Sequence, residues 1–302
     1  MIRCDRVSVE LGGQLVVAPL SLHVRAGEAW AIVGPSGAGK SSLLAAMATA
    51  QPLHGGDVVV DGRSVRREPE AVRRLIGYAP AVLPDWPGLR AGELLEVFAS
   101  AAGLQAAAVR QAVEKSLAMA GLAGRGRARL DSLPAGQAKH LLIARALLHD
   151  PEVLLFDDPF TGLDPAQTRA VERLIGDAHL MGRAVVAAID DGRVPGCFTH
   201  LAMLREGRLV AEGGNDPAAF AAGRRWRVVI RVPGRAAAAT AAVRPLARRV
   251  DLLDDDMLSA VIDPGAAALS ELVGALVRAG LPVESAGYEP PWQAQLVDEQ
   301  SD

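Results

Sequence analysis

The chain has 302 residues, which allows two domains at roughly 150 residues each. Half of the residues are hydrophobic and 22% are charged, a balance too apolar for a disordered chain. The formal net charge of -3 argues against a general nucleic-acid-binding protein. Composition therefore predicts a globular protein with a sizeable core and no nucleic-acid partner.

Cysteine usage and hydropathy bear on the compartment. Cys4 and Cys197 lie far apart without a CxxC spacing, which is typical of ordinary thiols in a reducing compartment. No signal peptide is recognisable, and no apolar run approaches the roughly 18–20 residues that a membrane span needs. We therefore expect a cytoplasmic protein that reaches a membrane only through a partner.

The first two thirds of the chain alternate between strand and helix patterns. Short strands are expected at 7–9, 20–24 and 29–33, followed by a glycine-rich loop, a helix over 42–50 and a strand and turn at 58–62. Residues 91–123 and 138–149 have helical composition, and the apolar runs 153–156 and 184–189 are typical of strands buried on both faces. This order predicts an α/β domain with a largely parallel sheet.

A change in composition near residues 213–217 indicates a domain boundary. Beyond it we expect a strand over 226–232, a helix over 235–247, two strands within 248–263, a helix over 266–279 and a strand over 282–286. The order β-α-β-β-α-β is typical of a ferredoxin-like domain. The predicted domains are residues 1–215 and a small C-terminal α+β domain over 225–302.

The glycine-rich loop is the strongest functional signal. Residues 34–41 fit the pattern G-x-x-x-x-G-K-[ST] between a strand and a helix. In that pattern backbone N–H groups surround phosphate oxygens, the lysine reaches the β and γ phosphates, and the serine hydroxyl binds Mg²⁺. The predicted nucleotide-binding residues are Gly34, Pro35, Ser36, Gly37, Ala38, Gly39, Lys40, Ser41 and Ser42.

Two aspartates follow the buried strand at 153–156. Asp157 comes at its carboxyl end, which places it at the sheet edge beside the phosphate-binding loop. There it can hold Mg²⁺ directly or through water, together with Ser41. These motifs predict a nucleoside triphosphate with Mg²⁺, but kinases, GTPases and ATPases all share them.

The segments around these motifs resemble the ABC ATPase family. Residues 133–137 are similar to its LSGGQ signature, 153–158 to its Walker B strand, 161–165 to its D-loop, and 76–80 with 89–95 to its Q-loop region. The resemblance covers roughly residues 1–215 and implies a P-loop fold with a helical subdomain at about 82–140. The tail after residue 225 is similar to the C-terminal extension of the drug- and antibiotic-exporter branch.

The resemblance also implies partners and cofactors. In the family two ATP-binding chains face head to tail, and each ATP with its Mg²⁺ lies between one chain's phosphate loop and the other chain's signature. The partners implied are a second ABC ATPase chain, as homo- or heterodimer, and a separate transmembrane permease subunit at the inner face of the cell membrane. The residues implied for the signature and dimer contact are Leu133, Pro134, Ala135, Gly136, Gln137 and Asp164.

Several positions depart from the family pattern. The catalytic base, usually glutamate, is Asp158, which is shorter by about 1.5 Å. Ala81 stands at the Q-loop glutamine, Asp190 at the switch histidine, and Leu11 at the adenine-stacking aromatic. Pro134 and Ala135 replace a serine and a glycine of the signature.

These departures affect hydrolysis more than binding. Each hydrogen bond lost to a charged group is worth on the order of 1.5–3 kcal/mol, and most losses lie outside the phosphate loop. We expect ATP binding with slow turnover, Asp158 being the candidate base. The leading hypothesis is an ATP-hydrolysing transporter subunit that drives export, and the alternative is a non-hydrolysing regulatory or assembly module. A P-loop kinase or a soluble nucleic-acid ABC protein is less supported, because no second cassette or acceptor motif is evident.

Overall fold

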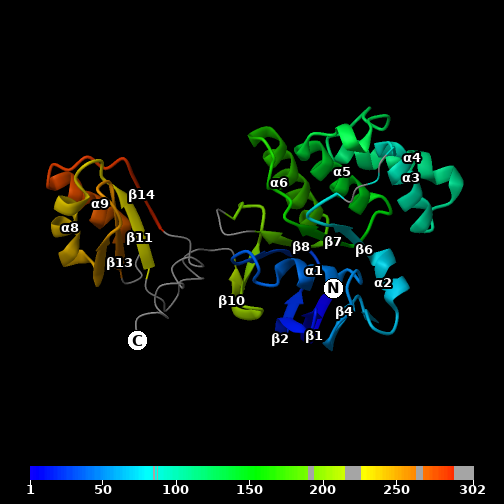
Figure 1. Cartoon of the computed structure of the whole chain (residues 1–302), viewed down its shortest axis with the longest axis horizontal. Helices are drawn as coiled ribbons and strands as arrows, with labels where there is room; N and C mark the ends of the chain where they lie inside the picture. Colours follow the sequence, from blue (N-terminus) through cyan, green and yellow to red (C-terminus); the bar gives the residue numbers. More distant parts are fainter. Residues whose placement is uncertain (84–85, 87, 190–193, 215–225, 263–267, 289–302) are drawn as a thin grey trace. The chain divides into compact units, whose positions relative to one another are not determined.

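The computed structural model describes the chain apart from residues 84–85, 87, 190–193, 215–225, 263–267 and 289–302 (Figure 1). Contacts divide the chain into two compact units, Met1–Glu212 and Gly213–Asp302, and each is described by itself. Within the described residues, no helix has the length and apolar character to cross a membrane.

The first unit is built on a six-stranded sheet with the order β10-β9-β3-β8-β7-β6. Strand β3 pairs in parallel with β8 and β9, and β7 pairs in parallel with β8 and β6. Every residue of β3, β7 and β8 is buried, as expected for continuous apolar strands covered on both faces. The largely parallel sheet is thereby confirmed. The strands are β3 (Ala29–Val33), β6 (Ile76–Ala79), β7 (Val153–Asp157), β8 (Ala184–Ile189), β9 (His200–Arg205) and β10 (Arg208–Gly214).

A second, four-stranded sheet has the order β2-β1-β4-β5, in which β1 pairs antiparallel with β2 and β4. Gly12 and Gly13, both at positive φ, form the two-residue turn between β1 and β2. Register shifts interrupt the β1–β2 pairing between Cys4 and Glu10, and both strands are longer than the predicted fragments 7–9 and 20–24. The strands are β1 (Ile2–Leu11), β2 (Gln14–Val24), β4 (Gly55–Val60) and β5 (Arg63–Ser64).

Helices pack on these sheets. Helix α1 (Lys40–Met47) contacts both sheets and buries Leu43, Leu44 and Met47 completely. The helical stretch predicted over 91–123 forms two helices, because Gly103 at φ 87° ends the first one. The remaining helices of this unit are α2 (Pro69–Leu75), α3 (Ala91–Ala101), α4 (Ala106–Met119), the 3-10 turn Leu130–Ser132, α5 (Ala135–Leu147) and α6 (Pro165–Leu180).

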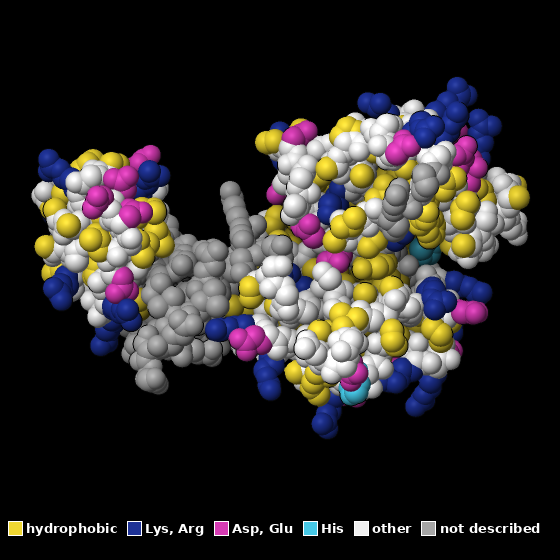
Figure 2. Space-filling view, viewed as in Figure 1, with side chains coloured by type: hydrophobic (Ala, Val, Ile, Leu, Met, Phe, Trp, Pro, Cys, Tyr) yellow, Lys and Arg dark blue, Asp and Glu magenta, His cyan; other side chains and the backbone are white. Residues whose placement is uncertain are grey.

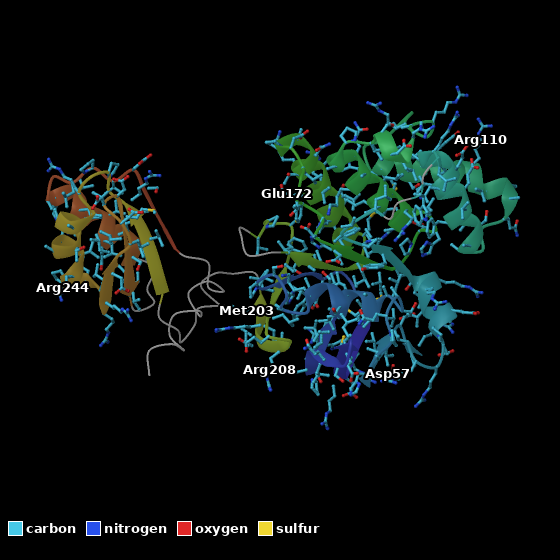
Figure 3. All side chains as sticks on the ribbon, in the orientation of Figure 1. Asp57, Arg110, Glu172, Met203, Arg208 and Arg244 are labelled. Carbon is cyan, nitrogen blue, oxygen red and sulfur yellow. The ribbon has the colours of Figure 1, made fainter. Side chains whose placement is uncertain are left out.

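Helices α3, α4 and α5 pack on one another and form a helical layer of the first unit (Figure 1). Basic side chains gather over the α3–α4 part of this layer (Figure 2). Arg110 on α4 is exposed beside Glu114, with 3.2 Å between the guanidinium Nε and Oε1 (Figure 3). Arg129 pairs with Asp131 in the same way, so part of this positive charge is compensated locally.

The second unit follows the predicted order β-α-β-β-α-β. Its sheet runs β12-β13-β11-β14, and β11 pairs antiparallel with β13 and β14. The apolar core includes Val228, Ile230, Leu258, Leu272 and Leu276. The final strand begins at 285 rather than at 282. The elements that its described residues form are β11 (Trp226–Arg231), α8 (Ala236–Val243), the 3-10 turn Arg244–Leu246, β12 (Arg249–Leu252), β13 (Met257–Ile262), α9 (Ala268–Arg278) and β14 (Ser285–Tyr288).

Candidate functional site

The loop between β3 and α1 requires glycine at two positions. A Cβ atom on Gly34 would lie 2.0 Å from the carbonyl oxygen of Leu204, and one on Gly39 would lie 2.5 Å from that of Val16. Both residues also have positive φ, of 153° and 96°. The loop is therefore pressed against two neighbouring strands, and its backbone is presented on the other side at the N-terminus of α1.

Lys40 and Ser41 open α1, and the Lys40 side chain points back toward this loop. The Lys40 ammonium donates to the carbonyl oxygens of Gly34 at 2.6 Å and of Pro35 at 2.9 Å. The Ser41 hydroxyl donates to Asp157 Oδ1 at 2.9 Å, which connects the start of α1 to the end of β7. The two residues expected to hold Mg²⁺ thus lie side by side although 116 positions separate them in sequence.

Asp157 has the character of a cation ligand. It is 6% exposed, and burial raises the pKa of its carboxyl; the Ser41 hydrogen bond opposes the rise, and the nearby charge of Asp158 adds to it. A bound divalent cation would compensate this buried negative charge. No cluster of three or more His, Cys, Asp or Glu suited to a metal occurs among the described residues. The Ser41 hydroxyl and the Asp157 carboxylate are oxygen groups of the kind that Mg²⁺ prefers as ligands, so this pair fits the ion.

These groups share one cavity of about 370 Å³. It brings together the β1–β2 hairpin, the phosphate loop, and the ends of β6, β7 and β8. Gly34, Pro35 and Ala38 belong to the loop but not to the lining, and Ala38 is buried behind it. The lining residues are Leu11, Val16, Ser36, Gly37, Gly39, Lys40, Ser41, Ser42, Ala81, Asp157, Asp158 and Ala188.

Asp158 follows directly after β7 in a left-handed conformation, with φ 49°. Its backbone N–H donates to the carbonyl oxygen of Ala188 at 3.0 Å, and its side chain is 29% exposed in the cavity. Lys139 of α5 donates to the carbonyl oxygens of Asp158 and Ala81 and approaches the Asp158 carboxylate. Sequence reasoning missed Lys139; the available signal was its rarity, because the chain has only three lysines.

The segment 133–137 and Asp164 lie outside the lining of this cavity. Residues Leu133 and Pro134 precede α5, whose first turn holds Ala135, Gly136 and Gln137. Asp164 caps α6 by accepting from the N–H groups of Ala166 and Gln167, both at 2.8 Å. The side chain of Gln167 accepts from the Asp164 N–H and also lies against Gly136, where an added Cβ would be 2.5 Å from its Oε1. Gly136 therefore lets the start of α5 pack against the capped start of α6.

Comparison with known proteins agrees with this architecture. The sequence profile of the ABC transporter family matches residues 17–161. The Nod factor export ATP-binding protein I of Paraburkholderia xenovorans (strain LB400) is 30% identical over 264 residues, which are 87% of this chain and 86% of that protein. The chain belongs to the ABC transporter family of ATP-binding proteins.

Solved ABC cassettes share the fold. A dimeric ATP-binding cassette in a post-hydrolysis state, bound to ADP and phosphate, aligns with a TM-score of 0.66 at 24% identity over 72% of this chain and 99% of that one. An ATP-binding subunit of an ABC transporter aligns with the same score over 74% of this chain and 93% of that one. The prediction of an α/β P-loop ATPase fold is confirmed.

Of the positions that depart from the family pattern, Leu11 and Ala81 line the cavity together with Asp158. Leu11, 49% exposed, stands on the cavity wall where an aromatic ring was expected. Ala81 lines the cavity with only a methyl side chain, and its carbonyl oxygen accepts a hydrogen bond from Lys139. Asp190 lies outside the described residues.

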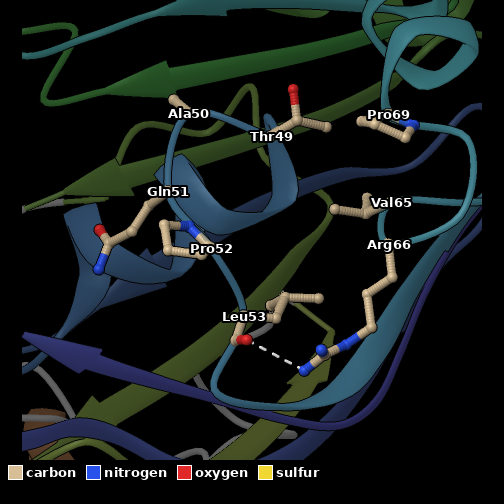
Figure 4. Close-up of a pocket in the computed structure, with 8 residues that line it drawn as sticks. All are labelled: Thr49, Ala50, Gln51, Pro52, Leu53, Val65, Arg66 and Pro69. Carbon is tan, nitrogen blue, oxygen red and sulfur yellow. Dashed lines mark hydrogen bonds between the residues drawn. The ribbon is translucent and has the colours of Figure 1, made fainter.

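A second cavity of about 410 Å³ lies beyond the C-terminal end of α1 (Figure 4). Arg66 crosses its edge and donates to the carbonyl oxygens of Leu53 at 3.0 Å and Gly56 at 2.6 Å. Its lining is Thr49, Ala50, Gln51, Pro52, Leu53, Val65, Arg66 and Pro69, without a carboxylate to bind a metal ion or accept a proton. This second cavity therefore lacks the carboxylates that Asp157 and Asp158 supply in the cavity at the phosphate loop.

Proposed function

We propose that this ABC ATPase binds Mg–ATP in the cavity at the phosphate loop and hydrolyses it slowly to drive export through a separate membrane subunit. The observation that carries the proposal is the cavity itself. It unites Lys40, the Ser41–Asp157 pair and the Asp158 carboxylate from segments far apart in the chain. A glycine turn without a ligand role would not require this convergence.

The phosphate loop and Lys40 bind the triphosphate. Backbone N–H groups of the loop and the positive end of α1 face phosphate oxygens, and the Lys40 ammonium exchanges its carbonyl partners for the β and γ phosphates. Ser41 and Asp157 hold Mg²⁺, which when bound neutralises charge on the phosphate oxygens. Leu11 supplies apolar contact to the base without ring stacking.

Asp158 serves as the base. Its carboxylate accepts a proton from water, directly or through a second water, while the water oxygen bonds to the γ phosphorus. The bond from phosphorus to the bridging oxygen breaks, and ADP and inorganic phosphate leave. Because the aspartate side chain is one methylene shorter than glutamate, the proton transfer is slow. Ala81 has no side-chain amide in place of the family's glutamine, and Asp190 has a carboxylate in place of the family's imidazole.

The second half of each nucleotide site comes from a partner chain. Leu133–Gln137 and Asp164 lie outside this chain's own cavity, which suits contact with a nucleotide on a second ABC ATPase chain. Pro134 offers that nucleotide neither a hydroxyl nor an N–H group. In a homodimer each nucleotide site would have both the substituted catalytic positions and the substituted signature. In a heterodimer one site would have the substituted catalytic positions and the other the substituted signature.

Export and membrane association are supported by the relative named for Nod factor export, whose length this chain covers to 86%. We infer a transmembrane permease subunit as partner and a cytoplasmic position on the inner face of the cell membrane, with no nucleic-acid partner. The ATP-binding domain is taken as 1–215, with its helical subdomain at about 82–140, and the small domain as 225–302.

The test is phosphate release by the purified chain with Mg–ATP. We expect slow turnover that disappears in Lys40→Ala, because the substitution removes the cation that holds the β and γ phosphates. Asp158→Glu should raise turnover by about tenfold or more, since it restores the reach of the base. Absence of turnover in the parent and in Asp158→Glu, with ATP still bound, would refute hydrolysis.

One observation favours a second candidate function, a non-hydrolysing ATP-binding regulatory or assembly module. The cavity wall at Ala81 carries a methyl group, so it has no side-chain donor for water or Mg²⁺. This candidate predicts ATP-dependent dimers that persist without phosphate release, which sedimentation with and without Mg–ATP would detect.

A further inference from the structure

A partly buried lysine connects helix α5 to two residues that line the cavity at the phosphate loop. The Lys139 side chain is 10% exposed, and its ammonium has three oxygen neighbours. It donates to the carbonyl oxygen of Asp158 at 2.6 Å and to that of Ala81 at 2.8 Å, and it lies 3.4 Å from Asp158 Oδ2. One cation thus joins three segments: α5, the residue after β7 and the segment after β6.

These distances indicate what the lysine holds. Charge-assisted hydrogen bonds are about 2.7–2.9 Å long, so the two backbone contacts are close and the carboxylate contact is long. Lys139 therefore fixes main chain, and it leaves the Asp158 carboxylate available within the cavity. A lysine whose main role is to form an ion pair with Asp158 would make its shortest contact with that carboxylate instead.

The main chain of Asp158 needs such support. A left-handed conformation is unfavourable for an L-residue and persists where its surroundings over-determine it. On the described structure the Asp158 peptide is held by the Ala188 carbonyl oxygen on one side and by Lys139 on the other. The direction of the Asp158 side chain follows from this backbone conformation.

We propose that Lys139 is a positioning residue that ties Asp158 and Ala81 to α5. Because α5 begins with Ala135–Gln137, the same tether couples the signature segment of this chain to its own cavity. A shift at the start of α5 then displaces the carboxylate of Asp158. The effect on rate rests on the proposed hydrolysis, whereas the tether itself does not.

The test compares Lys139→Met with Lys115→Met in the full-length chain. Lys115 on α4 provides a matched control, because it is 62% exposed and its carboxylate partner Asp150 lies at 4.0 Å. Amide hydrogen exchange is followed in peptides that cover 76–82 and 153–159. Single-turnover phosphate release and ATP affinity are measured on the same samples.

We expect Lys139→Met to speed exchange in both peptides and to lower the single-turnover rate by about ten- to a hundredfold, as for a misplaced catalytic group. ATP affinity should stay within about twofold, because Lys139 does not line the cavity. Lys115→Met should change neither readout, and Lys139→Arg should restore much of the rate. In an Asp158→Ala background, Lys139→Met should have no further effect on rate.

Unchanged exchange in both peptides would overturn the proposal, and so would faster exchange without a loss of rate in a chain that hydrolyses ATP. If the parent releases no phosphate in a single turnover, the proposed hydrolysis fails and the exchange comparison still decides the tether. Lys139→Gln gives the same comparison with a neutral donor, should Lys139→Met fail to fold.

Discussion

Two glycines of the phosphate loop allow a sharp test, because alanine should affect them differently. Gly37 and Gly39 both have positive φ, of 83° and 96°. A Cβ on Gly37 would meet no atom within 4 Å, whereas one on Gly39 would lie 2.5 Å from the carbonyl oxygen of Val16 and 3.0 Å from Val17 Cγ2. Gly37→Ala therefore isolates backbone strain, and Gly39→Ala adds a collision with β2.

The magnitudes follow from these contacts. Left-handed strain costs an alanine about 1–2 kcal/mol, which is the whole expected loss for Gly37→Ala. Overpacking against a backbone that must shift adds about 1–3 kcal/mol, so Gly39→Ala should lose about 2–5 kcal/mol. A difference of about 2 kcal/mol corresponds to about 6 °C in Tm for a unit of this size.

Scanning calorimetry of the full-length chain would measure the difference. The relevant transition is the one that Mg–ATP shifts in the parent, since only the first unit contains the phosphate loop. Gly39→Ala should also move the start of α1 and lose most of the ATP-induced shift. Equal losses of Tm in the two variants would show that the close approach of the loop to β2 does not determine its glycine requirement.

Three further outcomes are expected. Mg–ATP at about 100 times its Kd should stabilise the first unit by about 2.7 kcal/mol, and Ser41→Ala should reduce the shift in Tm. Asp164→Ala should cost about 1 kcal/mol in urea unfolding, because α6 loses its cap. Burial lowers the pKa of His149 below its ordinary 6.5, and its Nε2 has no partner. The folded chain resists a proton that the unfolded chain accepts, so stability should fall as pH drops below about 6.5, and His149→Gln should weaken that dependence in urea titrations.

The sequence predicted best where burial is continuous. The strands at 29–33 and 184–189 have the predicted bounds, because apolar runs covered on both faces leave no ambiguity of register or face. The break in the helical stretch 91–123 was not predicted, because a glycine such as Gly103 also occurs inside helices and its positive φ is visible only in the structure. Local sequence patterns identify such helices and strands, but they determine the first and last residue of each only weakly.

The site divides in the same way. The phosphate loop was recognisable because strand, loop and helix are consecutive. Lys139 was not, because its partners Ala81 and Asp158 are 58 and 19 positions away. On a helix a lysine is usually solvated, and only the tertiary fold buries this one. The chain contacts that support Asp158 therefore could not be read from spacing.

The residues that match the family pattern and those that depart from it belong to different steps, nucleotide binding and hydrolysis. Hydrogen bonds of Lys40, Ser41 and Asp157 connect α1, the loop and β7, and in the proposed function these residues hold the ground-state triphosphate and its Mg²⁺. Asp158 and Ala81 also line the cavity, at positions where a glutamate and a glutamine of the family would act on the attacking water. Interactions made only in the transition state change rate and leave affinity nearly intact. Because Lys139 donates to the main-chain carbonyl oxygens of both residues, the position of their backbone does not depend on their shortened side chains. Asp158→Glu, which adds a single methylene, is thus the smallest change that tests whether the length of this side chain, rather than the position of its backbone, limits the rate of ATP hydrolysis.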